Sequence, residues 1–303
     1  MYDLMVIGGG PSGLAASVYA ARKQLKTLLV SVDIGGQVNL TLGIENYLGY
    51  QFIEGPELID KFQSQVSQFP IDQKIGKKVS RLEKIEGGFE AASETGEKYQ
   101  SKTVVLATGK RPRKLNVPGE LELVGRGVTY CAICDGPIFS EQRVVVVGGG
   151  NSALEAALDM SKIAEHVDLV SLTPLTGDAI LIDKLGEAKN LDLFIEYQTE
   201  TIEGQGLVEG MLIKDLKSGE RKQLDITGVF IEIGLVPNSE LVRELVQLNS
   251  IGEVPINYSC ETGISGLYAA GDVTDAPEKQ IVIAAGEGAK AALQAHRYLQ
   301  RLV

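Results

Sequence analysis

The stretch that decides the fold is Leu4-Met5-Val6-Ile7-Gly8-Gly9-Gly10-Pro11-Ser12-Gly13. Its four apolar residues predict a buried strand, and the glycines that follow fit the pattern G-x-G-x-x-G. Small residues at 14–21 predict a helix, and residues 27–30 predict the next strand. In such a βαβ unit the glycines serve a tight turn, close backbone approach to a pyrophosphate, and close helix–strand packing. The stretch therefore predicts a dinucleotide site at the N-terminus of the helix.

A carboxylate that binds the ribose is expected at the end of the second strand of this unit. That position holds Ser31, and Asp33 follows two residues later. Asp33 is therefore the candidate for ribose binding, with an ordinary loop carboxylate as the alternative.

The unit recurs later in the chain. Val146-Val147-Gly148-Gly149-Gly150-Asn151-Ser152-Ala153-Leu154 repeats the pattern of residues 6–14 at a distance of 140 residues. A predicted helix at 154–163 and a predicted strand at 167–170 complete the second copy. Two copies of one βαβ unit predict two nucleotide-binding-type domains.

The order of the remaining elements predicts how these domains are connected. Residues 268–272 read as a strand that ends in a small-residue turn, and residues 280–302 read as a terminal helix. We expect these C-terminal elements to complete the first domain. The predicted fold is therefore α/β, with two Rossmann-like three-layer domains, the first discontinuous (1–115 and 240–303) and the second (116–239) inserted.

Composition and charge limit the function classes. The chain has 303 residues, 44% of them hydrophobic, and a net charge of −11, which argues against nucleic acid and anionic membrane as partners. Its first residues lack the basic start and long apolar core of a signal peptide, and no window reaches the roughly 18 apolar residues of a membrane span. The prediction is a cytoplasmic protein.

A pair of cysteines stands between the two glycine turns, in Cys131-Ala132-Ile133-Cys134-Asp135-Gly136-Pro137. Two thiols at this spacing can close into a disulfide and reopen, and Asp135 follows the second thiol directly. The alternatives are a pair of buried thiols or half of a zinc site, which needs about four ligands. Cys260, His166 and His296 are the only other cysteine and histidine residues, and none has ligand spacing. No metal site is predicted.

These motifs, in their order, resemble those of a known family. The chain is similar along essentially its whole length to the low-molecular-weight thioredoxin reductases, and also to the flavoprotein part of alkyl hydroperoxide reductase. The peroxide-reductase flavoprotein carries an extra N-terminal domain of thioredoxin type, which this chain is expected to lack. The matching motifs are Gly8 to Gly13, Gly35-Gly36-Gln37, Glu45-Asn46-Tyr47, Ala107-Thr108-Gly109, Cys131 to Pro137, Gly148 to Ala153, Ala270-Gly271-Asp272 and Lys279-Gln280-Ile281.

The resemblance implies FAD in the first domain and an NAD(P)-binding-like second domain that carries the cysteines. It places the first glycine turn and Gly271 at the pyrophosphate, Asp272 at the pyrophosphate and ribitol, Gln37 and Asn46 on the flavin side, and Gln280 at the isoalloxazine edge. The full set of expected cofactor-binding residues is Gly8, Gly10, Pro11, Ser12, Gly13, Asp33, Gln37, Asn46, Ala107, Thr108, Gly109, Gly271, Asp272, Lys279, Gln280 and Ile281.

The resemblance also implies a reaction. The cysteine pair takes electrons from reduced flavin; Cys131 then attacks a protein disulfide and Cys134, nearer the flavin, resolves the mixed disulfide. Asp135 would carry the proton, because a carboxyl group desolvated beside flavin and thiols can titrate high enough to act as acid and base. The implied acceptor is thioredoxin or a thioredoxin-like protein, and the implied assembly is a homodimer whose inserted domain rotates.

The chain departs from the family where a nicotinamide donor would bind. NADPH-dependent members carry an arginine-rich turn for the 2′-phosphate, whereas residues 171–178 here contain no cation and end in Asp178. NADH enzymes place a carboxylate where this chain has Ser171. The candidate nucleotide turn consists of Gly148, Gly150, Asn151, Ser152 and Ala153. Three donors stay open: NADH held through this turn, NADPH held by other contacts, and a donor such as ferredoxin that replaces the nucleotide.

Ferredoxins are acidic, so docking would require a basic patch. Lys110, Arg111, Arg113 and Lys114 form the only dense basic cluster, and a solvated linker is the favoured interpretation. Alternatives to the reductase are an NAD(P)H-dependent enzyme that feeds a peroxiredoxin system and a non-catalytic flavin and disulfide redox sensor. A ferredoxin–NADP reductase of the same fold lacks the cysteine pair.

Overall fold

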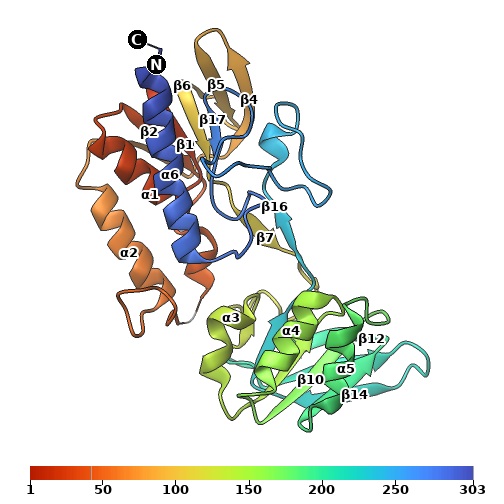
Figure 1. The fold of residues 1–303 in the computed structure, drawn as a ribbon. Coiled ribbons are helices and arrows are strands. Elements are labelled where there is room, and N and C mark those ends of the chain that lie inside the picture. The colour runs from red at the N-terminus through yellow and green to blue at the C-terminus, as the bar shows by residue number, and fades with distance from the viewer. Residues whose placement is uncertain (42, 303) are drawn as a thin grey trace.

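Two α/β domains joined by a two-stranded ribbon make up the fold (Figure 1). The computed structural model describes residues 1–41 and 43–302. The chain leaves the first domain through β7 (Lys110–Pro112) and returns through β16 (Leu235–Pro237), and these strands pair antiparallel. The second domain is thus inserted into the first, as predicted. The exact domain boundaries stay a prediction, although the ribbon lies close to both of them.

The first domain contains a sheet in the order β3-β2-β1-β6-β5-β4, with β17 also paired to β6. Strands β1, β2, β3, β6 and β17 run parallel, and β4, β5 and β6 form an antiparallel meander. The elements are β1 (Tyr2–Ile7), α1 (Pro11–Arg22), β2 (Thr27–Ser31), the 3-10 helix η1 (Gly36–Leu40), α2 (Gly55–Val66), β3 (Asp72–Ile75), β4 (Val79–Ile85), β5 (Gly88–Ser93), β6 (Lys98–Leu106), η3 (Glu240–Val242), β17 (Leu267–Ala269) and α6 (Ile281–Gln300).

Strand β1 is buried on both faces, which is why its sequence is continuously apolar. Leu4 and Val6 belong to the core formed with α1 and α6, whereas Met5 and Ile7 belong to the core on the opposite face, which includes the meander. Helices α1 and α6 approach closely, because a Cβ added to Gly288 of α6 would lie 1.9 Å from the carbonyl oxygen of Ser12. The C-terminal helix thus completes the first domain, as expected.

The second domain has a parallel sheet in the order β11-β10-β9-β15-β8 and a separate antiparallel sheet in the order β12-β13-β14. Its elements are β8 (Val128–Thr129), α3 (Ala132–Asp135), η2 (Gly136–Phe139), β9 (Arg143–Val147), α4 (Asn151–Met160), β10 (His166–Ser171), α5 (Ala179–Glu187), β11 (Leu191–Ile195), β12 (Tyr197–Glu203), β13 (Gly210–Asp215), β14 (Arg221–Asp225) and β15 (Gly228–Ile231).

Strand β9 shows how the three layers of this domain are held together. Val144 and Val146 pack towards the helix layer, with Leu154 of α4, and Val145 and Val147 pack towards the antiparallel sheet. Because successive strand residues point to opposite faces, one run of valines serves both interfaces. The predicted α/β class and three-layer arrangement are confirmed.

Within the described part of the chain, no helix has both the length and the apolar character needed to cross a membrane.

Candidate redox site

A cleft of about 1210 Å³ is lined by residues of both domains. From the first domain come the first glycine turn and the segment that begins α6, and from the second comes the cysteine pair. Most residues predicted from the sequence line it: Gly8, Gly10, Pro11, Ser12, Asp33, Gln37, Asn46, Ala107, Thr108, Gly109, Cys131, Cys134, Asp135, Asp272, Lys279, Gln280 and Ile281. The structure thus brings together motifs from both ends and the middle of the chain.

The first glycine turn is shaped by contacts that exclude side chains at Gly8, Gly9 and Gly13, and a Cβ on Gly9 would lie 2.4 Å from the carbonyl oxygen of Asp33. Gly8 has a φ of +115°, and an added Cβ would lie 2.2 Å from the carbonyl oxygen of Ala107. A Cβ on Gly13 would lie 1.9 Å from the carbonyl oxygen of Gly8. A Cβ on Gly10 would meet nothing within 4 Å, although Gly10 lines the cleft. Gly8 and Gly13 therefore serve the turn and the packing, and Gly10 keeps the cleft open.

Two predicted cofactor residues have another place in the structure. Gly13 and Gly271 are absent from the cleft lining, and the backbone N–H of Gly271 donates to Oε2 of Glu287 at 2.8 Å. Glu287 is a buried residue of α6 that sequence reasoning did not single out, because a lone glutamate in a helix has no motif around it. Burial raises the pKa of Glu287, and the Gly271 N–H opposes this.

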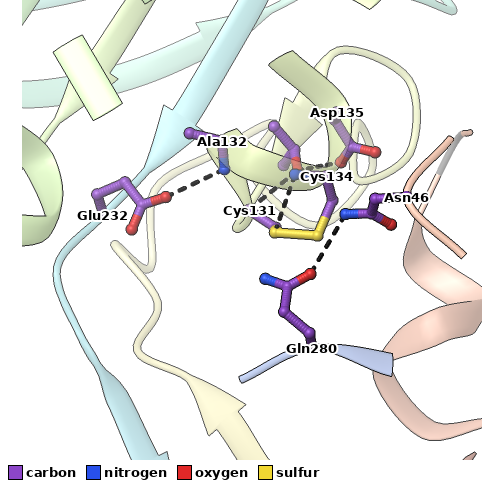
Figure 2. The surroundings of a disulfide bond; sticks show 8 residues. Asn46, Cys131, Ala132, Cys134, Asp135, Glu232 and Gln280 are labelled. Carbon is purple, nitrogen blue, oxygen red and sulfur yellow. Dashed lines mark hydrogen bonds between the residues drawn. A yellow bond between two sulfur atoms is a disulfide. The ribbon is translucent and has the colours of Figure 1, made fainter. Parts of the chain in front are cut away.

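Polar side chains close the cleft near the cysteines. Asn46 Nδ2 donates to Gln280 Oε1 at 3.2 Å, and Figure 2 shows this pair beside the disulfide. The carboxylate of Asp33, which also lines the cleft, accepts a hydrogen bond from the N–H of Gly36 at 3.2 Å. Lys279 lines the cleft, but its ammonium donates to the carbonyl oxygens of Thr274 and Ala276 at 2.6 and 2.5 Å. The ammonium of Lys279 therefore also stabilises the loop of residues 274–279 that precedes it.

The cleft fits FAD, the cofactor that the first domain implies. Ligand clefts for medium-sized molecules occupy roughly 300–1,000 Å³, so 1210 Å³ accommodates an extended dinucleotide. The open position at Gly10 lies at the N-terminus of α1, where backbone N–H groups favour an anion. Asn46 and Gln280 supply polar groups next to the disulfide, and Gln37 supplies another in the cleft lining. Contacts of individual residues with FAD stay a prediction.

Cys131 and Cys134 form a disulfide, with their Cα atoms 5.3 Å apart. Cys131 precedes the short helix α3, and its Sγ accepts a hydrogen bond from the backbone N–H of Cys134 at 3.2 Å. Asp135, at the end of α3, is buried and accepts a hydrogen bond from the hydroxyl of Thr129. That hydroxyl also accepts from the N–H of Cys131 at 3.2 Å, so Thr129 links the first cysteine to the carboxyl group.

Glu232 is a second carboxyl group at the pair, and sequence reasoning missed it. It follows β15, and its Oε1 accepts a hydrogen bond from the N–H of Ala132 at 3.2 Å (Figure 2). Burial raises the pKa of Glu232 to about 7, and the Ala132 N–H opposes the rise. A sequence signal existed, because Glu232-Ile233-Gly234 follows a strand just as Ala107-Thr108-Gly109 does.

The second glycine turn, unlike the first, is absent from the lining of the cleft. Asn151 Nδ2 donates to Asp178 Oδ2 at 3.1 Å, and the N–H of Asp178 donates to Asn151 Oδ1 at 2.7 Å. The N–H of Thr176 donates to the carbonyl oxygen of Gly149 at 2.7 Å. The loop after β10 is thus bonded directly to the turn and to the start of α4.

The basic cluster differs from the favoured interpretation of a solvated linker. Lys110 is buried, and its ammonium lies 2.5 Å from Glu253 Oε1, which Lys279 also approaches at 3.3 Å. Arg111 pairs with Glu240 at 2.8 Å. Two cations of the cluster are therefore committed to carboxylates of the first domain, because the ribbon folds back on residues 240–253.

The remaining cysteine and histidine candidates lie in structural surroundings. Cys260 is buried, and burial raises the pKa of its thiol to about 11. His166 Nε2 lies 3.3 Å from Asp168 and 3.4 Å from Asp192, a cluster on β10 and β11 that the spacing of cysteines and histidines alone does not reveal. Burial raises the pKa of Asp168, and the charges of His166 and Arg143 oppose it.

Comparison with known proteins agrees with this geometry. The model of the family "Pyridine nucleotide-disulphide oxidoreductase" matches residues 2–289. A component of alkyl hydroperoxide reductase in Staphylococcus aureus (strain MRSA252) is 41% identical over 301 residues, which cover 99% of this chain but only 59% of that protein. The chain thus spans about 59% of the length of this relative.

Solved structures cover the chain more evenly. Thioredoxin reductase of Streptococcus pyogenes MGAS5005 has a TM-score of 0.94 at 36% identity, with 99% of each chain covered. Lactococcus lactis thioredoxin reductase in the FR conformation has a TM-score of 0.69 at 33% identity, covering 99% of this chain and 100% of that one. The chain belongs to the pyridine nucleotide-disulphide oxidoreductase family. The predicted resemblance to both thioredoxin reductase and the peroxide-reductase flavoprotein is confirmed, and with it the class of flavoprotein disulfide oxidoreductase.

Proposed function

We propose that this chain is an FAD-dependent disulfide reductase that passes electrons through Cys131 and Cys134 to the disulfide of a thioredoxin-type protein. One observation carries the proposal: the Cys131–Cys134 disulfide lines the same cleft as Gly10 of the first glycine turn and Gln280 at the start of α6. A redox-active pair next to a dinucleotide-type cleft is the arrangement that such a transfer requires.

The chain's own residues supply the thiol chemistry. FAD held in the cleft and reduced by the electron donor would supply the two electrons that open the disulfide. The two sulfur atoms then require two protons, and we assign one of them to Asp135, because it lines the cleft and is linked to Cys131 through Thr129. The Cys131 thiolate attacks the partner's disulfide and releases one partner thiolate, and Cys134 then displaces the other, which restores the Cys131–Cys134 bond.

Replacement of Cys134 by Ser tests this proposal. The variant should bind FAD, seen in its visible absorbance, and lose turnover of a thioredoxin disulfide. Cys260→Ser is the matched control, because Cys260 is buried away from the pair and should leave turnover intact. Full turnover by the Cys134 variant would overturn the mechanism. Retained flavin and disulfide chemistry without catalytic turnover in the native protein would instead favour a redox sensor.

We also infer that the electrons do not come efficiently from NADPH. The loop that would grip the 2′-phosphate contains no cation, and Asp178 is bonded to Asn151 at the start of α4. A carboxylate at this place repels a phosphate. Ser171 replaces the acidic ribose anchor of NADH enzymes, and its hydroxyl donates to the carbonyl oxygen of Thr173 at 2.7 Å. A one-electron protein donor such as ferredoxin is the favoured source, and NADH is the alternative. Because Lys110 and Arg111 are paired with carboxylates, such a protein would dock away from these two cations.

Anaerobic titration of the flavin with NADPH, NADH and reduced ferredoxin separates these donors. We expect bleaching by reduced ferredoxin and little bleaching by stoichiometric NADPH. Prompt bleaching by NADPH would refute the inference drawn from Asp178, and prompt bleaching by NADH would select the alternative.

A second acceptor is favoured by the 41% identity to the alkyl hydroperoxide reductase component. In that case the electrons would reach a peroxiredoxin through a separate thioredoxin-like carrier. Reduction of thioredoxin alone, compared with peroxide consumption in the presence of carrier and peroxiredoxin, distinguishes the two acceptors.

The proposed assembly is a homodimer in which the inserted domain rotates about the ribbon of β7 and β16, with domains at 1–115 plus 240–303 and 116–239. The different TM-scores of two thioredoxin reductases of similar identity, 0.94 and 0.69, support two arrangements of the same domains. Light scattering of the FAD-loaded protein tests the dimer, because a monomeric mass would contradict it.

A further inference from the structure

Glu232 lies beside the cysteine pair but outside the cleft, and the proposed reaction does not use it. Its backbone N–H donates to the carbonyl oxygen of Val147 at 2.8 Å, which extends the pairing of β15 with β9 by one residue. Its carboxylate accepts the N–H of Ala132, the residue that follows Cys131. In Figure 2 Glu232 and Asn46 lie on opposite sides of the disulfide.

The internal repeat explains how a carboxylate reaches this position. A Cβ on Gly8 would lie 2.2 Å from the carbonyl oxygen of Ala107, and a Cβ on Gly148 would lie 2.4 Å from that of Glu232. Ala107 likewise donates its N–H to the last residue of β1, Ile7, at 2.8 Å. Ala107 and Glu232 are therefore equivalent positions of the two domains. The first domain has a methyl group there, and the second has an ionisable side chain.

The charged surroundings of Glu232 are few among the described residues. Asp135 stands at the far end of α3, and Tyr130 before Cys131 donates its hydroxyl to Glu120 at 2.9 Å. Arg113 of the linker donates its backbone N–H to Gly234 at 3.0 Å. Burial dominates, and it raises the pKa of Glu232 to about 7. The charge of Glu232 therefore changes in the range where thiol exchange operates.

We propose that Glu232 is a positioning residue for Cys131, whose carboxylate controls how readily the reduced Cys131 thiol releases its proton. A negative charge held one residue away disfavours a second one on the sulfur. When Cys131 ionises beside the charged carboxylate, one proton leaves the sulfur for solvent, Glu232 stays ionised, and no electron moves. Because the thiolate is the nucleophile, the charged Glu232 carboxylate lowers the reactivity of Cys131 above neutral pH. The inference rests on the proposed function only in taking Cys131 as the attacking thiol.

The test measures thiol reactivity and not turnover. Cys131 is kept reduced in an FAD-loaded Cys134→Ser protein, and its alkylation by iodoacetamide is followed by peptide mass spectrometry from pH 5.5 to 9. The added variants are Glu232→Gln, which removes the charge, Glu232→Asp, which keeps a carboxylate, and Glu155→Gln, an exposed control on α4. Slow alkylation of the buried Cys260 reports any loss of folding.

Glu232→Gln should alkylate about 3- to 10-fold faster than its parent at pH 7.5, as expected from the loss of a nearby like charge, and its profile should lose the inflection near neutrality. Glu232→Asp should stay closer to the parent. Identical profiles for Glu232→Gln and Glu155→Gln would overturn the proposal, as would Glu232→Asp reacting as fast as Glu232→Gln. Turnover of a thioredoxin disulfide is measured separately. If that turnover does not depend on Cys134, the proposed function is contradicted, whatever the alkylation profiles show.

Discussion

The two glycine turns follow the same backbone plan and differ in what surrounds them. Each follows a parallel strand, and each has a first glycine, Gly8 or Gly148, pressed against a carbonyl oxygen of the neighbouring strand's end. In each, a loop N–H also bonds the middle glycine: Gly35 donates to Gly9 at 2.8 Å, and Thr176 donates to Gly149 at 2.7 Å. The shared geometry therefore belongs to the βαβ unit itself.

The difference lies in the side chains. Around the first turn stand Ala107, Ser31 and Asp33, the carboxylate of Asp33 accepts the N–H of Gly36, and the turn lines the 1210 Å³ cleft. Around the second stand Asp178, bonded to Asn151, and Glu232, at the position equivalent to Ala107. A glycine-rich turn is thus evidence for the fold, whereas the neighbouring loop and strand end decide whether a dinucleotide can be held.

The largest expected effect comes from adding a side chain at Gly10 in the first turn, compared with the same change at the equivalent Gly150 in the second turn. Gly10→Val places a side chain in the open cleft without a backbone clash, so the protein should fold but bind FAD at least about 100-fold more weakly, because the pyrophosphate loses close backbone approach. Gly150→Val should leave FAD affinity unchanged. Flavin release followed by fluorescence measures both, and equal losses in the two variants would break the comparison.

A smaller effect concerns stability and pH. The pKa of Glu232 is raised in the folded protein to about 7 from its usual value of 4.5, so the folded state binds more protons than the unfolded state between these values. The free energy of unfolding therefore falls as pH rises from 4.5 to 7. Glu232→Gln should remove this loss and be more stable than the native protein by about 1–3 kcal/mol at about pH 8, with little difference near pH 4.

Urea unfolding of the FAD-loaded protein at pH 5 and pH 8 measures this effect. Ala107→Glu is the converse variant, since it places a carboxylate at the equivalent position of the first domain. It should acquire a pH-dependent loss of stability and weaken FAD binding. A Glu232→Gln protein that follows the native pH dependence would show that the carboxyl group is solvated.

The smallest expected effect concerns the two hydrogen bonds between Asn151 and Asp178. Asp178→Ala removes the carboxylate from the start of α4 and should strengthen NADH binding by roughly 3- to 10-fold, because one repulsive charge is lost. Asp178→Asn removes the charge but keeps a polar partner for Asn151, so it distinguishes the effect of the charge from the effect of the hydrogen bond. Isothermal titration with NADH gives both affinities, and an unchanged affinity in the two variants would place the barrier elsewhere in the loop.

A site residue can be predicted from the sequence when it belongs to a short motif, and not when only partners far along the chain mark it. Gly8, Gly10 and Cys131 belong to short motifs with their own geometric reasons, and all three line the cleft. Glu232 and Glu287 stand alone in the sequence and become visible only through partners 100 and 16 residues away. The interpretation of Lys110 as part of a solvated linker is wrong, because its partner Glu253 is remote in the chain and gives no local signal.

The sequence by itself determined the two βαβ units, their inserted order and the redox-active pair, because each rests on local spacing and on the burial pattern of a few strands. The tertiary structure alone decided that the disulfide shares a cleft with the first turn and that the second turn is bordered by two carboxylates. It also decided that Lys110 is an internal cation. These facts depend on contacts between segments far apart in the chain, which no local pattern records.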